Sequence, residues 1–380
     1  MPDPSQDQRF MQAALGLARR GLGNAWPNPA VGCVIVKDGR VVGRGWTQPG
    51  GRPHAESEAL ARAGDAAAGA TAYVSLEPCS HWGRTPPCAD ALIEAGIARV
   101  VAAVEDPDPR VAGSGLARLR AVGRAVESGV CAAEASEINA GFFRRVRSGR
   151  PLVTLKLATS LDGRIATASG ESRWITGEEA RAMAHLLRAT HDAVLVGTGT
   201  VLADDPQLTC RLPGLGARSP VRVVLDRRLR IPPTARVMAE ATAVPTWLVT
   251  APNPPERARV LRERQVEIVE TALGANGRID LAAMLLRLGE RGLTRVLVEG
   301  GGQLAASLLG GGLVDRLVWF HAPLLLGGDG VAAVAALGLD RLAEMPRFAP
   351  VASQPIVHQL LGPDAMSVFA VTCSRSGDRG

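Results

Sequence analysis

The 380-residue sequence has few aromatic residues, hardly any lysine and no long apolar segment. Aromatic residues make up 3% of the chain and include a single tyrosine, which argues against a stacking platform for single-stranded nucleic acid. The only lysines are Lys37 and Lys156, and the arginines behind the net charge of +6 are scattered along the chain. We therefore expect small anionic partners such as phosphates, and no nucleic acid.

No stretch approaches the ~20 consecutive apolar residues that cross a bilayer. The polar first residues also lack the apolar core of a signal peptide. These two absences predict no membrane partner and a cytoplasmic location. The six cysteines make a poor disulfide framework in a chain of this length, so metal ligation is the better interpretation for the neighbouring Cys79 and Cys88.

The length and the alternation of strand-like and helical segments predict two α/β domains, residues 1–149 and 150–375, divided at a Gly- and Pro-containing segment. In the first domain the patterns predict helices at 7–22, 54–63, 89–95, 115–121 and 132–147, and strands at 31–36, 40–45, 71–76 and 100–104. In the second they predict strands at 152–157, 193–196, 221–225, 246–250, 266–269, 296–298 and 317–320, and helices at 178–190, 281–291 and 303–309. Residues 212–220 and 251–255 are predicted loops.

One imidazole, two thiols and a spare carboxylate occur close together in the first domain. They belong to His54-Ala55-Glu56 and to Cys79 and Cys88, with residues 80–87 between the thiols. Catalytic zinc keeps three protein ligands and leaves one position for water, whose pKa it lowers to ~7. We predict that His54, Cys79 and Cys88 hold Zn²⁺ and that Glu56 carries protons beside it, as in zinc-dependent nucleobase deaminases. A coincidental grouping is the alternative.

A glycine-rich segment, Glu299-Gly300-Gly301-Gly302, lies between a predicted strand and a predicted helix. Glycines at that place let a backbone approach a pyrophosphate, and the helix N-terminus favours its charge. A plain tight turn is the alternative, and no Gly-x-Gly-x-x-Gly occupies the strand-to-helix position of a Rossmann domain. Trp174 either covers a nicotinamide or packs in the core.

Several motifs resemble the bifunctional riboflavin-biosynthesis deaminase/reductase family. In the first domain they are residues 27–29, 31–32, 54–56, 76–81 and 83–88, and in the second 156–164, 170–177, 197–206 and 298–302. The long segment between the two cysteines distinguishes this family from cytidine and tRNA-adenosine deaminases. The resemblance covers nearly the whole chain.

The resemblance implies a cytidine-deaminase-like three-layer domain followed by a dihydrofolate-reductase-like α/β domain. It implies zinc-dependent deamination of 2,5-diamino-6-(5-phosphoribosylamino)pyrimidin-4(3H)-one, followed by NADPH reduction of the ribosyl group to a ribityl chain. A homo-oligomer, dimer or larger, is also expected. Two rivals stay open: a nucleoside or tRNA deaminase with an unrelated C-terminal half, and a ligand-sensing protein built on an inactive enzyme.

The resemblance also implies residue roles. The cofactor contacts it implies are Ala158, Trp174, Thr200, Asp204, Arg227 and Gly301. The substrate contacts are Asn28, Arg84, Ser172, Arg188, Leu208, Arg211 and Glu299, with Arg188 and Arg211 on the phosphate and Asn28 on the base. The candidate proton donors of the reductase are Lys156, Asp204 and Glu299.

Two positions depart from the family pattern. Residues 106–113 are expected to contact the ribose and phosphate of the deaminase substrate, but Asp108 stands where an asparagine is expected. A carboxylate is a worse neighbour for phosphate. Arg227 replaces an expected small polar residue, and a guanidinium there is able to reach the 2′-phosphate of the cofactor.

Overall fold

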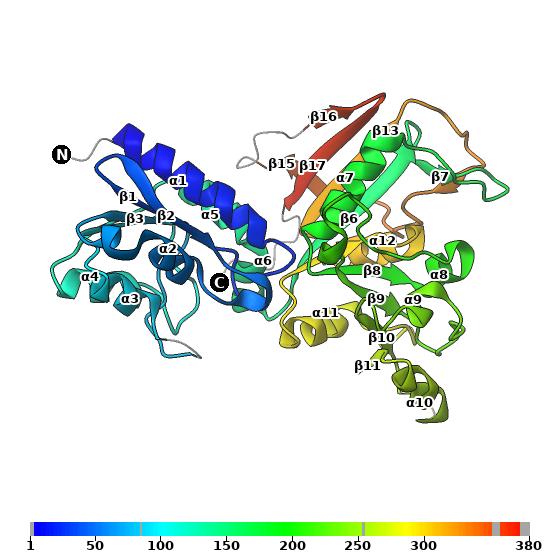
Figure 1. Ribbon diagram of the computed structural model, residues 1–380. Coiled ribbons are helices and arrows are strands. Elements are labelled where there is room, and N and C mark those ends of the chain that lie inside the picture. Colours follow the sequence, from blue (N-terminus) through cyan, green and yellow to red (C-terminus); the bar gives the residue numbers. More distant parts are fainter. Residues whose placement is uncertain (1–3, 84–85, 253–254, 352–357, 373–380) are drawn as a thin grey trace. The chain divides into compact units, whose positions relative to one another are not determined.

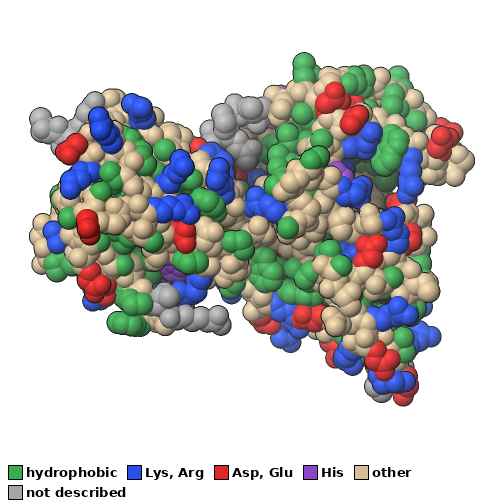
Figure 2. Space-filling view, in the orientation of Figure 1, with side chains coloured by type: hydrophobic (Ala, Val, Ile, Leu, Met, Phe, Trp, Pro, Cys, Tyr) green, Lys and Arg blue, Asp and Glu red, His purple; other side chains and the backbone are tan. Residues whose placement is uncertain are grey.

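The computed structural model describes residues 4–83, 86–252, 255–351 and 358–372. The chain forms two compact units, Met1–Gly149 (unit 1) and Arg150–Gly380 (unit 2), each with its own large sheet (Figure 1). Among the described residues, no helix is long and apolar enough to cross a membrane. On the face shown in Figure 2, basic and acidic side chains are interspersed on each unit.

Unit 1 contains a five-stranded sheet in the order β2-β1-β3-β4-β5. Strands β1, β2 and β3 pair antiparallel, whereas β3, β4 and β5 run parallel. The strands are β1 (Gly32–Lys37), β2 (Arg40–Trp46), β3 (Thr71–Val74), β4 (Arg99–Ala102) and β5 (Ala125–Ser128). The helices are α1 (Pro4–Ala18), α2 (Ala55–Ala63), α3 (Cys88–Glu94), α4 (Ser114–Ala121), α5 (Ala132–Ile138) and α6 (Ala140–Ser148).

Helices cover both faces of the unit 1 sheet because its central strands are apolar on both sides. In β1, Val34 and Val36 point into a core shared with α1 and α5. Cys33 and Ile35 point to the opposite face and pack with α2, α3, α4 and α6. This confirms the expected three-layer arrangement.

The single helix predicted over residues 132–147 is wrong: the chain forms α5 and α6, with a break at Asn139. The Asn139 side chain is buried and pairs with the backbone of Ala30, accepting from its N–H at 2.9 Å and donating to its C=O at 3.1 Å. A buried amide needs such partners, so satisfying it outweighs an unbroken helix.

Unit 2 contains a ten-stranded sheet in the order β11-β10-β9-β8-β12-β6-β13-β17-β15, with β16 also paired to β17. The strands are β6 (Leu152–Ser160), β7 (Arg164–Ala166), β8 (Ala193–Gly197), β9 (Val221–Leu225), β10 (Thr246–Thr250), β11 (Glu267–Glu270), β12 (Arg295–Val298), β13 (Arg316–Ala322), β14 (Val331–Ala332), β15 (Arg347–Pro350), β16 (His358–Leu361) and β17 (Asp364–Thr372). The helices are α7 (Glu178–Ala189), α8 (Thr198–Asp204), α9 (Arg236–Ala239), α10 (Pro255–Glu263), α11 (Leu281–Glu290) and α12 (Gly302–Gly310).

From β11 to β13 the neighbours in the unit 2 sheet run parallel, and β17 adds an antiparallel edge. This mixed α/β architecture agrees with the reductase-like fold expected for the second half. The sequence patterns missed β5 and the strands β15 to β17, which lie at or near sheet edges where exposed and buried residues do not alternate cleanly. Of the predicted loops, 212–220 contains one 3₁₀ turn (Gly216–Arg218), and in 251–255 residues 253–254 lie outside the described residues.

His191 occupies a buried position between α7 and the sheet. Its Nδ1 lies 2.7 Å from the carbonyl oxygen of Leu187 and its Nε2 lies 2.9 Å from the hydroxyl of Thr154. A neutral ring satisfies both contacts, because Nδ1–H donates to the carbonyl and Nε2 accepts from the hydroxyl. Burial, assisted by the nearby charge of Arg295, lowers the pKa of His191 to about 4.

We expect acid to destabilise unit 2 through His191. The unfolded chain protonates this histidine below pH ~6.5, while the folded state keeps it neutral until about pH 4. Stability is therefore present above the unfolded pKa and is lost as pH falls, by roughly 2 kcal/mol between pH 7 and pH 5. In urea unfolding, His191→Asn should show a shallower decline over that range. An equal decline in both proteins would contradict this role of His191.

Candidate active sites

The three predicted zinc ligands of unit 1 lie at the starts of two helices and at the end of a strand segment. His54 is the residue before α2, Cys88 is the first residue of α3, and Cys79 follows β3. The local fold therefore brings one imidazole and two thiols from three segments to one point.

The geometry of the three side chains fits tetrahedral zinc. Their ligand atoms all lie within 4.8 Å of one another. The Nδ1 atom of His54 is 3.3 Å from Sγ of Cys88 and 3.7 Å from Sγ of Cys79. Zinc bonds of ordinary length at tetrahedral angles would separate N and S ligands by about 3.6 Å. The Cys88 thiol, together with His54, holds the pKa of Cys79 well below its usual range, which favours the thiolate that binds metal.

Glu56 lies in the first turn of α2, beside the three ligands, and is almost fully buried. Burial raises its pKa to about 7, against the opposing charge of His54. A carboxyl group with a pKa near neutral pH exchanges protons readily in both directions. The spare carboxylate thus lies beside the three predicted ligands in a form that gains and loses a proton near neutral pH.

Helix α2 reaches this position because β2 has a glycine beneath it. A Cβ at Gly45 would collide with the carbonyl oxygen of Ala55 and approach the Cβ of Glu58 to 2.6 Å. Any larger residue would push the start of α2 away from the sheet. The glycine therefore sets the height of His54 and Glu56 above the strand ends.

Glu77 is a further functional residue that the sequence analysis missed. Its buried carboxylate accepts hydrogen bonds from backbone N–H groups: Oε1 from Gly115 and Leu116 at 2.8 and 3.2 Å, and Oε2 from Gly113 and Asp106 at 2.9 and 3.2 Å. One side chain thus fixes the segment before the ligand Cys79 to the start of α4 and to residues 106–113. The available signal was a charged residue immediately before Pro78-Cys79.

The predicted substrate contacts of unit 1 have mixed outcomes. The Asn28 side chain is held by its amide, which donates to the carbonyl of Gly51 at 2.9 Å, just ahead of His54. Arg84 lies outside the described residues. Asp108 is buried, and Arg110 lowers its pKa by donating from Nε at 2.9 Å and from Nη2. The carboxylate that departs from the family pattern is therefore neutralised within its own loop.

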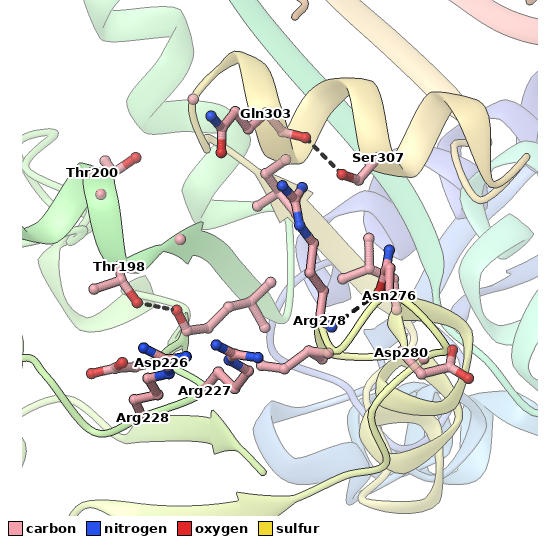
Figure 3. A pocket seen from close by; sticks show the side chains of 18 of the residues that line it. Thr198, Thr200, Asp226, Arg227, Arg228, Asn276, Arg278, Asp280, Gln303 and Ser307 are labelled. Carbon is pink, nitrogen blue, oxygen red and sulfur yellow. Dashed lines mark hydrogen bonds between the residues drawn. The ribbon is translucent and has the colours of Figure 1, made fainter. Parts of the chain in front are cut away.

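A cavity of about 1130 Å³ opens in unit 2 at the carboxyl ends of β8, β9 and β12 (Figure 3). Parallel α/β sheets commonly bind ligands at this edge. Four of the predicted cofactor contacts line the cavity, namely Thr200, Asp204, Arg227 and Gly301. Ala158 and Trp174 are not among its lining residues. Trp174 is 67% exposed, which excludes core packing, and the guanidinium of Arg181 lies 4.6 Å from its ring centre.

The cavity has the features of a dinucleotide site. At Gly199 and Gly301 a Cβ would meet no atom within 4 Å, so a side chain would extend into the open space. At Gly302, the first residue of α12, a Cβ would come within 2.8 Å of the carbonyl oxygen of Ala332. These glycines leave a backbone cradle beside a helix N-terminus, which suits the pyrophosphate of NADPH.

Beside the cavity lies a buried group of charged residues from three elements. The Arg188 side chain on α7 donates to both carboxylate oxygens of Glu299, from Nε at 2.6 Å and from Nη2 at 2.8 Å. Burial raises the pKa of Glu299, but Arg188 and Lys156 outweigh it and lower the pKa to about 2. Burial lowers the pKa of Lys156, although Glu299 opposes this shift. The group therefore pairs a fixed carboxylate with an ammonium that releases its proton more easily than usual.

The remaining predicted substrate contacts of the reductase are Arg188, Arg211, Leu208 and Ser172. Arg188 also donates from Nη1 to the carbonyl of Thr209 at 3.0 Å, so much of its guanidinium already serves the protein. Arg211 lies two residues further along, and its backbone N–H points to Nδ1 of His185 at 3.3 Å. Leu208 is buried with a φ of 57°, and Ser172 is half-buried.

Comparison with known proteins gave matches for both halves. Residues 4–104 match the cytidine and deoxycytidylate deaminase zinc-binding region, and residues 151–361 match the RibD C-terminal domain. The riboflavin biosynthesis protein RibD of Escherichia coli (strain K12) is 47% identical over 356 residues, which cover 90% of this chain and 95% of that protein. RibD of Aquifex aeolicus (strain VF5) is 44% identical over 89% of this chain and 92% of its own.

Solved structures agree with the sequence matches. Acinetobacter baumannii RibD, form 1, has a TM-score of 0.86 at 41% identity, covering 98% of this chain and 100% of that one. A Thermotoga maritima protein described as a diaminohydroxyphosphoribosylaminopyrimidine deaminase/5-amino-6-(5-phosphoribosylamino)uracil reductase has a TM-score of 0.84 at 35% identity, covering 97% and 99%.

The fold and the two sites define an enzyme that joins a zinc-dependent deaminase to a nucleotide-dependent reductase. Because both halves match one bifunctional family, a deaminase with an unrelated C-terminal half is not favoured. The chain belongs to the RibD family of riboflavin-biosynthesis proteins. It is a bifunctional deaminase and reductase that uses Zn²⁺ and NADPH.

We expect Glu77→Gln to impair deamination without emptying the zinc site. The carboxylate accepts two hydrogen bonds at each oxygen, whereas an amide has only one acceptor oxygen. At least two of the four hydrogen bonds from backbone N–H groups are therefore lost, which destabilises this part of the fold by about 1–3 kcal/mol. The rate of ammonia release should fall about tenfold or more, while zinc content and reduction stay unchanged. Glu94→Gln on the exposed end of α3 is the matched control. An unaltered rate in Glu77→Gln would contradict the positioning role.

Proposed function

We propose that each unit carries one of two consecutive reactions. Unit 1 would deaminate 2,5-diamino-6-(5-phosphoribosylamino)pyrimidin-4(3H)-one. The predicted reductase domain, residues 150–375 within unit 2, would reduce the ribosyl group of the product to a ribityl chain. The observation that carries the first assignment is the buried Glu56 beside His54, Cys79 and Cys88. The substrate is that of the family and matches the description of the Thermotoga maritima relative.

In unit 1, His54, Cys79 and Cys88 would hold zinc, and the buried Glu56 would move protons. Zinc in such a site supplies a Lewis acid that makes water a nucleophile near neutral pH. Glu56 would take the proton of the attacking water and deliver protons to the ring nitrogen and to the departing amine. Asn28 would contact the base edge, Arg84 is proposed from the family pattern alone, and residues 106–113 would contact the ribose and phosphate.

We expect Glu56→Gln to keep zinc and to lose deamination, because an amide cannot carry the proton. The fall in ammonia release should be about 10²- to 10⁴-fold, while reduction of the deaminated substrate survives. Glu58→Gln, two residues along the same helix, removes only a surface ion pair with Arg62 and should change little. Normal ammonia release from Glu56→Gln would refute the proton-carrier role.

In unit 2, the cavity would hold NADPH through Thr200, Asp204, Arg227 and Gly301. Ala158 and Trp174 do not line the cavity but would contact the bound NADPH. The charged group beside the cavity would receive the opened ribose. Arg211 would bind the substrate phosphate. Arg188 would contribute those of its N–H groups that do not bond to Glu299 or Thr209. The remaining predicted contacts to the substrate are Glu299, Ser172 and Leu208. NADPH supplies hydride when it is bound.

We propose Lys156 as the proton donor of the reductase, because burial makes its ammonium a stronger acid than an ordinary lysine. Lys156→Met should slow reduction by roughly 10²- to 10⁴-fold while NADPH binding and ammonia release are kept. Lys37→Met, at the other lysine, serves as the control. A normal rate of reduction in Lys156→Met would exclude it and leave Asp204 as the donor, because the ion pair with Arg188 keeps Glu299 deprotonated.

The decisive experiment for the whole assignment is mass spectrometry of the product formed from the pyrimidinone phosphate. Without NADPH, the substrate should lose one amino group as ammonia. With NADPH, the deaminated product should also gain two hydrogens. Release of ammonia from cytidine or adenosine-containing RNA instead would overturn the substrate. We further propose a cytoplasmic homo-oligomer, dimer or larger, from the family resemblance; light scattering and cell fractionation would test these two points.

A further inference from the structure

Four arginines line the unit 2 cavity: Arg227, Arg228, Arg230 and Arg278. The first three follow β9, and Arg278 comes from residues 274–280, the segment that leads into α11 (Figure 3). Two separate segments thus bring positive charge to the same cavity. Concave sites lined by one sign of charge attract ligands of the opposite sign.

Three acidic residues, Asp204, Asp226 and Asp280, also line the cavity, and two of them bond to backbone N–H groups. Asp226 accepts from the N–H of Ile231 at 2.8 Å. Asp280 caps α11 by accepting from the N–H groups of Ala282 and Ala283 at 2.9 and 3.0 Å. Within the described part of the chain, no carboxylate forms an ion pair with Arg228 or Arg278. Their charges are therefore free to bind an anion.

The two segments that carry the arginines are tied together. Nη1 of Arg227 donates to the carbonyl of Gly277, whose φ of 67° is in the left-handed region. A tight turn holds the backbone of Arg278, because its N–H donates to Oδ1 of Asn276 at 3.0 Å and its C=O accepts from Gly274 at 2.8 Å. Arg227 thus positions the segment that presents Arg278, whose side chain runs across the cavity toward Gln303 of α12 (Figure 3).

The strand order indicates which part of a dinucleotide would reach these arginines. Lys156 lies on β6 and Glu299 follows β12, so the reacting end of the cofactor belongs above these strands. The sheet continues from β12 to β8 and then β9. Three strand spacings from β6 to β9 amount to about 14 Å. The backbone cradle at Gly301 and α12 lies between the two ends, which leaves the adenosine end beside β9.

We propose that Arg228 and Arg278, held in place through Arg227, bind the phosphate on the adenosine ribose of NADPH and so select it over NADH. The inference rests on the proposed placement of NADPH in this cavity. NADPH and NADH differ only in that phosphate, and a planar guanidinium binds a phosphate through two parallel hydrogen bonds. This chain has Arg227 where the family pattern has a small polar residue, so its way of holding the phosphate is its own.

The test measures binding rather than turnover. Calorimetric titrations with NADP⁺, NAD⁺, adenosine 2′,5′-bisphosphate and 5′-AMP would be run on the full chain and on Arg228→Gln, Arg278→Gln and the double variant. Each single change should weaken NADP⁺ and the bisphosphate about tenfold or more, and should change NAD⁺ and 5′-AMP less than about twofold. Arg262→Gln, on the exposed side of α10 outside the cavity, is the matched control.

Two outcomes would overturn the inference: equal weakening of NADP⁺ and NAD⁺, or no change in NADP⁺ binding in the double variant. Gly301→Val separates this failure from a failure of the cofactor placement, because its side chain would enter the cavity and should weaken both dinucleotides. If Gly301→Val left both affinities unchanged, the cofactor would lie elsewhere and the placement itself would be wrong. Arg278→Lys keeps the charge but not the planar fork, and should retain part of the preference for NADP⁺.

Discussion

Parallel strand pairing is the constraint on which both sites depend. Parallel neighbours end at the same edge of a sheet, so the segments that follow them are brought together whatever their distance in sequence. In unit 1, Cys79 follows β3, and the segment bound by Glu77 follows β4. In unit 2, the segments after β8, β9 and β12 form the cavity. Each active site is therefore assembled at one edge of a sheet from several separate segments, and no single motif forms it.

The two sites use burial in opposite ways. In unit 1, Glu56 is buried without a cation bonded to its carboxylate, so its pKa rises to where a proton moves easily. In unit 2, Glu299 is buried in a two-point ion pair with Arg188, and its charge is fixed. The first arrangement favours proton transfer. The second favours holding a substrate in one orientation, which suits a reaction whose hydride comes from a separate molecule.

The sequence predicted the features that depend on residue type and spacing. His54, Cys79 and Cys88 were recognisable because few other roles require that set, and the long apolar strands were found from their composition. The sequence alone could not predict features that depend on tertiary partners. Asn139 breaks a helix because Ala30 lies opposite it, and the Glu77 carboxylate accepts hydrogen bonds from N–H groups of a distant loop. Such pairings appear only when the chain is folded.

The order of the strands along the chain also bears on how the enzyme is made. All three zinc ligands lie within the first 88 residues, and unit 1 is one continuous segment. A ribosome therefore releases a complete metal centre while much of the reductase is still unmade. Strand β6, the first of unit 2, must wait for its partners β12 and β13. The order of the two units along the chain is thus the same as the order of the two proposed reactions.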